Sequence, residues 1–233
     1  MPLVVAAVTP AQPSPRAAVH RQAFSLALAL IPFGIAFGIA CRRAGISTAG
    51  AMGFSSLVFT GGTQFAAVST LATGGGALAA TTAGVLLALR SLAYGVTMAP
   101  DLDGSRARRA ILAHLMIDES VAVATSQHDP HWRRYGYVVT GLSVFVVWNL
   151  TTFLGCVVVG DTSTLVEDFG LDATVPAAFL ALLWPRLRTF DARVLAVAGA
   201  AIAFGLVPVA PAGVPIIAAA AAVLLDGRTG RRT

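Results

Sequence analysis

The chain has 233 residues, of which 56% are hydrophobic and only 12% are charged, and its net charge is +5. Soluble domains carry about 25% charged residues, so this composition argues against a soluble domain and for a helical membrane protein. All sixteen basic residues are arginines, which are spread over the loops between apolar runs without an aromatic-rich groove. This distribution excludes nucleic acid as the expected partner.

Eight apolar segments follow one another along the chain, joined by short loops. They cover about residues 22–41, 49–72, 76–99, 107–125, 136–159, 173–185, 192–207 and 212–225. A membrane-spanning helix needs about 20 apolar residues. The pattern therefore predicts an all-α integral membrane protein with about seven transmembrane helices. Its expected parts are a flexible N-terminal tail (1–21), a single transmembrane transporter domain (22–225) and a basic C-terminal tail (226–233).

The second segment is interrupted by two adjacent glycines, Gly61 and Gly62, followed by the polar residues Thr63 and Gln64. Glycines allow the backbone to unwind and a ligand to approach it closely. A half-helix that begins at such a break presents an N-terminus that favours a carboxylate. We predict these four residues as substrate-binding residues. Close helix–helix packing on small residues is the alternative.

Arg90 lies inside the third segment, where burying a charge costs about 3 kcal/mol. It could bind a substrate carboxylate as a bidentate donor, or form a structural ion pair with Asp118, Glu119 or Asp172. Asp118 and Glu119 are adjacent in the fourth segment. A carboxylate in low dielectric binds a proton more readily, which predicts a proton-coupling role for this pair. The alternative is an interfacial helix whose acids face water.

Smaller features occur in the other segments. Gly34 and Gly38 have the spacing at which membrane helices pack closely, and the amide of Asn149 is expected either to bridge helices or to contact a substrate. Asp172 and Pro176 are typical of a helix start. A glycine-interrupted segment in the first half and a short, proline-containing one in the second suggest an inverted repeat with broken helices around a midplane binding site.

The arginine distribution predicts the orientation. If all eight segments span, ten loop arginines lie on one side and five on the other. If the fourth segment is instead re-entrant or interfacial, thirteen lie on one side against Arg16 and Arg21. Arginine excess marks the cytoplasmic side. Seven spans in the cytoplasmic (inner) membrane with a cytoplasmic C-terminus are therefore preferred.

Six stretches in this order carry a resemblance to a known family: Phe33–Gly38, Phe59–Ala66, Leu89–Arg90 with Tyr94–Gly95, Asp118–Ser120, Trp148–Leu150, and Leu171–Asp172 with Pro176–Leu180. Together they resemble the AzlC family, the larger subunit of AzlCD-type branched-chain amino acid exporters, over roughly residues 22–225. The family often has Asn two residues before the arginine and His directly after it. Ala88 and Ser91 stand there in this chain, which bears on specificity if this region binds the substrate.

The resemblance implies a secondary transporter subunit that exports branched-chain or related apolar amino acids with a small AzlD-type membrane subunit, driven by protons. Under it, Phe65 and Phe179 would shape the pocket for the substrate side chain. No phosphate-binding loop, Gly-x-Ser-x-Gly or HExxH motif is found, so neither an enzyme nor a cofactor or metal is expected. The alternatives are a channel or pore, formed by a homo-oligomer, and a scaffold for the small partner subunit.

Overall fold

The computed structural model describes residues 14–159 and 187–210, together with 180, 183–184, 214–220 and 222. Over these residues the regular structure is helical and includes no strand. Three helical stretches are long and apolar enough to cross a membrane, namely Pro15–Arg43, Ala77–Met98 and Pro130–Val157. The expected all-α membrane protein is confirmed.

In chain order the helices are α1 (Pro15–Ala29), α2 (Ile31–Arg43), α3 (Thr48–Leu57), α4 (Gly61–Ala72), α5 (Ala77–Ala88), α6 (Arg90–Met98), α7 (Arg106–His114), α8 (Asp118–Thr125), α9 (Pro130–Val159), α12 (Phe190–Leu206) and α13 (Val214–Ala220). The expected segments 22–41, 76–99, 136–159 and 192–207 correspond to α1–α2, α5–α6, α9 and α12. Helix α13 lies within the expected segment 212–225, whereas most of 173–185 is outside the described residues.

Helices α1 and α2 meet at Leu30, where Pro32 in the first turn of α2 bends the stretch. Proline lacks an N–H and its ring clashes with the preceding turn, which is a common cause of helix kinks. Helix α1 begins earlier than the expected start at residue 22. The reason is local: Ser14 Oγ accepts a hydrogen bond from Ala17 N–H (3.3 Å), and Pro15 occupies the first turn, where a missing N–H costs little.

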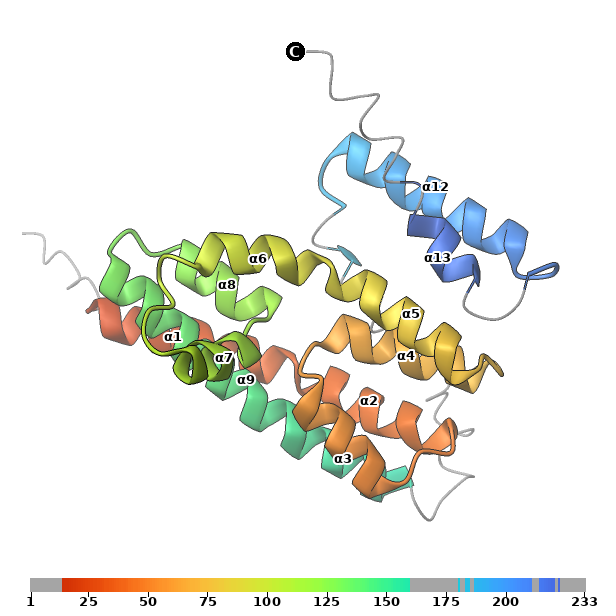
Figure 1. Ribbon diagram of the computed structural model, residues 1–233, viewed down its shortest axis with the longest axis horizontal. Helices are drawn as coiled ribbons and strands as arrows, with labels where there is room; N and C mark the ends of the chain where they lie inside the picture. The colour runs from red at the N-terminus through yellow and green to blue at the C-terminus, as the bar shows by residue number, and fades with distance from the viewer. Residues whose placement is uncertain are drawn as a thin grey trace, which may run out of the picture.

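The expected interruption of the second segment is confirmed, but its two halves do not form one straight helix. The Gln64 side-chain amide donates to the carbonyl of Ser55, nine residues earlier (3.3 Å). In a continuous helix these residues would be about 14 Å apart along the axis. Helix α4 therefore folds back beside the end of α3 at Val58–Thr60 (Figure 1).

The fourth segment is also broken, at Leu115–Ile117, into two short helices. Helix α7 has nine residues and α8 has eight, and neither can cross about 30 Å of hydrocarbon at 1.5 Å per residue. The Ser120 hydroxyl provides hydrogen-bond partners for backbone groups at the break: it accepts a hydrogen bond from Ile117 N–H (3.1 Å) and donates one to the Leu115 carbonyl (2.7 Å). This segment thus does not cross as a single helix.

Helix α9 runs the length of the main body, along its lower side in Figure 1, and packs against α1, α2, α3 and α8. The contact with α2 depends on glycines: a Cβ on Gly38 would lie 2.8 Å from the Cys156 nitrogen, and one on Gly155 would meet the Ile35 backbone. The predicted close packing at Gly38 is confirmed. Next to it, fully buried Phe37 stacks on Trp148, with ring centroids 6.0 Å apart.

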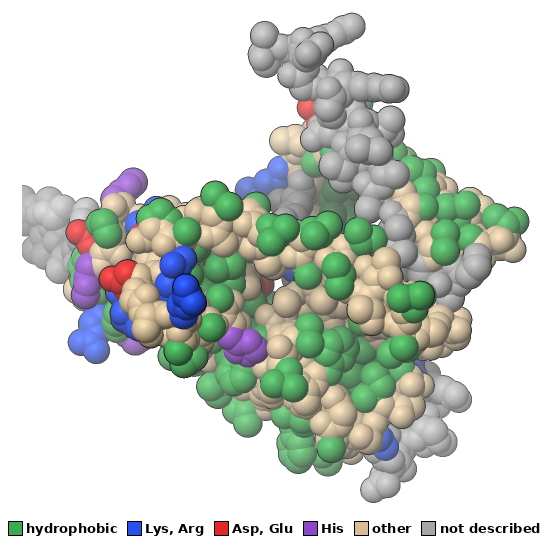
Figure 2. Space-filling model, viewed as in Figure 1, with side chains coloured by type: hydrophobic (Ala, Val, Ile, Leu, Met, Phe, Trp, Pro, Cys, Tyr) green, Lys and Arg blue, Asp and Glu red, His purple; other side chains and the backbone are tan. Residues whose placement is uncertain are grey.

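The remaining helices complete the assembly. Helix α4 packs between α2 and α5, and α13 contacts both α12 and α5. Leu78, Leu92 and Val96 on α5 and α6 are largely exposed, as expected for side chains that face lipid. Figure 2 shows charged side chains gathered where α7 and the start of α9 meet, and apolar ones over α5 and α6.

Ion pairs fix the charged end of the molecule. Asp101, after α6, accepts three hydrogen bonds from Arg133 at the start of α9 (3.2, 3.0 and 2.9 Å), and its side chain is only 8% exposed. Asp103 pairs with Arg108 and Arg134.

Candidate functional site

An ion pair between Arg90 and Asp118 joins the starts of two helices. Arg90 is the first residue of α6 and Asp118 the first of α8. Nη1 of Arg90 lies 3.0 Å from Oδ2 of Asp118, and the two side chains are 37% and 24% exposed. Asp118, one of the three carboxylates predicted as partners of Arg90, is thus in contact with it. The pair therefore combines opposite charges that a polar ligand can reach.

The glycines of the α3–α4 break lie beside this pair. A Cβ on Gly62 would stand 3.1 Å from Nη2 of Arg90, and one on Gly61 would stand 3.1 Å from Cη2 of Trp148. Both distances are shorter than an ordinary van der Waals contact, so glycine lets the guanidinium and the indole approach the backbone. Within the described residues no side chain caps α4, which leaves its first N–H groups for water or a ligand.

The charges of this site favour an anion next to Gly62. Asp118 balances Arg90, and the N-terminus of α8 stabilises the carboxylate that begins it. The N-terminus of α4 adds about half an elementary positive charge. A ligand carboxylate could thus bind between the Arg90 guanidinium and the α4 N–H groups, and an ammonium group of the same ligand could contact Asp118.

A second polar cluster surrounds the C-terminal end of α3. The Gln64 amide donates to the carbonyls of Phe54 (3.1 Å) and Ser55 (3.3 Å), and the Ser56 hydroxyl donates to Oδ1 of Asn149 (2.8 Å). Gln64 is fully buried. These two amides, which the sequence predicts as substrate-binding residues, are engaged in holding the end of α3.

His114 completes this cluster, although the sequence reasoning did not select it. Its Nε2 lies 2.8 Å from the carbonyl oxygen of Ser56, and its ring packs against Phe59 and Phe145, with centroids 6.1 and 5.8 Å away. The sequence feature that could have indicated His114 is its position four residues before Asp118. The hydrogen-bond partner of His114 is a backbone carbonyl, which cannot be recognised from the sequence because every residue has one.

The other predicted site residues have different surroundings. Thr63 is nearly buried and accepts a hydrogen bond from the Thr60 hydroxyl (2.8 Å). Phe65 is fully buried, with its ring against those of Phe37 and Trp148, so it belongs to the core. Glu119 is half-buried on α8. The predicted secondary residues Asp172, Pro176 and Phe179 lie outside the described residues.

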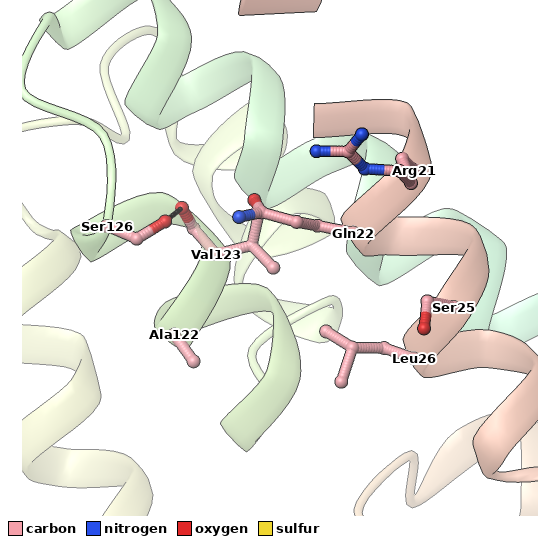
Figure 3. Close-up of a pocket in the computed structure, with 7 residues that line it drawn as sticks. All are labelled: Arg21, Gln22, Ser25, Leu26, Ala122, Val123 and Ser126. Carbon is pink, nitrogen blue, oxygen red and sulfur yellow. Dashed lines mark hydrogen bonds between the residues drawn. The ribbon is translucent and has the colours of Figure 1, made fainter. Parts of the chain in front are cut away.

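A cavity of about 500 Å³ lies between α1 and α8, and none of the predicted site residues lines it (Figure 3). Its lining residues are Arg21, Gln22, Ser25, Leu26, Ala122, Val123 and Ser126. Among the described residues no group of three His, Cys, Asp or Glu side chains could hold a metal ion.

Broken helices around an ion pair in an apolar bundle are typical of transporter-like membrane proteins, and the protein belongs to this class. Residues 25–161 match the family model described as AzlC protein. The chain is 32% identical over 210 residues to an uncharacterized membrane protein of Archaeoglobus fulgidus, covering 89% of this chain and 92% of the relative. It is 23% identical over 186 residues to the inner membrane protein YgaZ of Escherichia coli, covering 74% and 75%. No solved structure matches the chain.

The chain therefore belongs to the AzlC family, as the resemblance of its motifs indicated. AzlC is a membrane transport family whose members work with AzlD-type subunits. Family and relatives together support a transporter-like role in a membrane.

Proposed function

We propose that the protein is the larger subunit of a secondary transporter that exports branched-chain or related apolar amino acids from the cytoplasm. The observation that carries this proposal is the half-exposed Arg90–Asp118 pair beside the uncapped N-terminus of α4. An amino acid is a zwitterion with the complementary pair of charges. Its carboxylate would bind Arg90 and the α4 N–H groups near Gly62, and its ammonium group would replace Arg90 as the partner of Asp118.

Substrate binding of this kind opens an ion pair and replaces it with two new ones. The net charge at the site is unchanged, and the two new ion pairs offset the cost of removing water from the ammonium and carboxylate groups of the substrate. Opening the pair also separates α6 from α8, and this couples occupancy of the site to a movement of helices. We propose protons as the driving ions, with Asp118 and Glu119 at the start of α8 taking part in the coupling. A small AzlD-type subunit is the proposed partner.

The test is efflux of preloaded radiolabelled leucine, valine, isoleucine and methionine from cells that express the chain with its AzlD-type partner. Replacing Arg90 with Ala removes two charge-assisted hydrogen bonds to the carboxylate, each worth about 1.5–3 kcal/mol, which predicts efflux at low substrate slowed at least about 100-fold. Arg108→Ala is the matched control, since Arg108 is exposed and pairs only with Asp103 among the described acids. Normal efflux by Arg90→Ala would refute the assignment.

A charge swap separates substrate binding from a structural role of the pair. The double variant Arg90→Asp with Asp118→Arg retains one positive and one negative side chain at the same two positions. If the pair only fixes packing, the swap should restore both stability and efflux relative to the single variants. If it binds the zwitterion, stability should recover while efflux stays low, because the carboxylate would then face Asp beside Gly62.

A further inference from the structure

We propose that His114 carries the coupling proton and that its hydrogen bond to Ser56 links this proton to the substrate site. This inference rests on the proposed function and refines it, because it places the proton on His114 while Asp118 and Glu119 link its effect to the substrate site. Its basis is the position of the imidazole between two broken helices. The ring lies at the end of α7, and its Nε2 is bonded to the end of α3.

The hydrogen bond fixes which ring nitrogen can exchange a proton. A carbonyl oxygen only accepts, so Nε2 of His114 must carry a hydrogen and donate it to Ser56. Nδ1 is then the nitrogen that takes up or releases a proton. Uptake adds one proton to Nδ1 and converts the neutral ring to imidazolium. Release returns that proton to water, and the bond from Nε2 is present in both states.

Two helix ends meet at the ring. Ser56 lies in the last turn of α3, whose final carbonyls lack intrahelical partners, and His114 itself ends α7. The hydrogen bond from Nε2 therefore joins the end of α7 to the end of α3. The ring is half-buried rather than sealed, so water can reach it.

The side chains in ring contact with His114 carry no charge. They are Phe59 from the α3–α4 connection and Phe145 from α9, neither of which titrates. Ser56 on α3 contributes its carbonyl. The charged and titratable groups of the helices around the ring are Arg90, which starts α6, Asp118 and Glu119, which start α8, Arg106, Arg108 and Arg109 on α7 itself, and His131, Arg133, Arg134, Tyr135 and Tyr137 in the first turns of α9.

The proton and the substrate act on the same two chain breaks from opposite ends. At the α3–α4 break, His114 binds the end of α3, while Gly62 at the start of α4 contacts Arg90. At the α7–α8 break, His114 ends α7 and Asp118 starts α8. A change at one end of each break alters the constraint on the other end. By linkage, the effect of the proton on substrate affinity equals the effect of substrate on proton affinity.

The experiment uses the chain with its partner subunit in proteoliposomes and radiolabelled leucine as the probe. His114→Gln keeps an N–H donor for the Ser56 carbonyl but cannot titrate, whereas His114→Ala loses both properties. We expect His114→Gln to reduce leucine accumulation driven by a pH gradient at least about tenfold, within the usual range of coupling strengths. Exchange of internal for external leucine, which needs no net proton movement, should stay within about twofold of the wild-type rate.

Two controls keep the outcomes separate. His128→Gln changes an exposed histidine between α8 and α9 and should behave as wild type. The ¹⁵N resonances of the His114 ring, followed as the pH is changed with and without leucine, report directly whether Nδ1 takes up a proton and whether leucine alters that uptake. Gradient-driven accumulation by His114→Gln at the wild-type rate, or a ring that stays neutral throughout, overturns the inference. Wild-type protein that neither exchanges nor accumulates leucine overturns the proposed substrate instead, and the ring titration still decides the proton site.

Discussion

The closest packing between two long helices occurs where α2 crosses α9, and a single methyl group should disturb it. A Cβ on Gly38 would stand 2.8 Å from the Cys156 nitrogen and 3.0 Å from the Gly155 carbonyl carbon, and closer still to the Thr152 carbonyl oxygen. All three are backbone atoms, which cannot turn aside as a side chain can. An ordinary contact begins at 3.4 Å, so Gly38→Ala requires the helices to separate by about 0.6 Å or more.

A gap of this size removes a quarter to a half of the dispersion energy of the contacts that it opens, and overpacked cores typically lose about 1–3 kcal/mol. Alanine also stabilises a helix relative to glycine by about 1 kcal/mol. The control variant Gly53→Ala on α3 has the same gain in helix stability but no steric clash, because nothing lies within 4 Å of a Cβ at that position. The difference between the two variants therefore isolates the packing cost, which we expect to be about 1–3 kcal/mol.

The assay is reversible unfolding of the purified protein in mixed micelles by increasing fractions of sodium dodecyl sulfate. Trp148 is a suitable fluorescent reporter, since its ring stacks on Phe37 of α2 and is 4% exposed. Gly38→Ala should unfold at a lower detergent fraction than Gly53→Ala. Equal unfolding free energies of the two variants would refute the reasoning, because they would mean that α2 and α9 are not in backbone contact at Gly38.

Two further predictions use the same protein. Asp101→Asn leaves Arg133 without its nearly buried carboxylate partner and should lower the free energy of unfolding by about 3 kcal/mol. Asp103 is 69% exposed, so Asp103→Asn should lower it by less than about 1 kcal/mol. Equal losses in the two variants would contradict this ranking. Cys41 and Cys156 are free and buried, so both should resist a maleimide reagent in native membranes and react with it after unfolding. Mass spectrometry would detect the labelled thiols. Fast labelling of either thiol in native membranes would contradict the packing of α2 on α9.

The sequence predicted the features that depend on a residue's own chemistry. Paired glycines weaken a helix, and an arginine within an apolar run favours a carboxylate partner, so the break just before Gly61 and a partner for Arg90 could be foreseen. Gly38 was recognised from its spacing for the same reason. Each of these arguments concerns a single element or a single charge.

The features that were missed depend on how elements meet. The hydrogen bonds from Gln64 to the carbonyls of Phe54 and Ser55 show that α4 folds back beside the end of α3, and no local sequence pattern encodes that reversal. The role of His114 was hidden because its partner is a carbonyl, which every residue has. The early start of α1 did have a sequence signal, Ser14 followed by Pro15. It was missed because the helix start was predicted from hydrophobicity, and the first turns of α1 contain exposed polar residues.

The Arg90–Asp118 pair also affects the order in which the protein can be assembled in the bilayer. The stretch Ala77–Met98, which contains Arg90, emerges from the ribosome before Asp118 does. During that interval the arginine costs about 2.5–3.5 kcal/mol of insertion free energy without compensation from α8. The stretch reaches its final stability only when Asp118 arrives. During biosynthesis, α5 to α8 therefore enter the membrane as one cooperative unit rather than helix by helix.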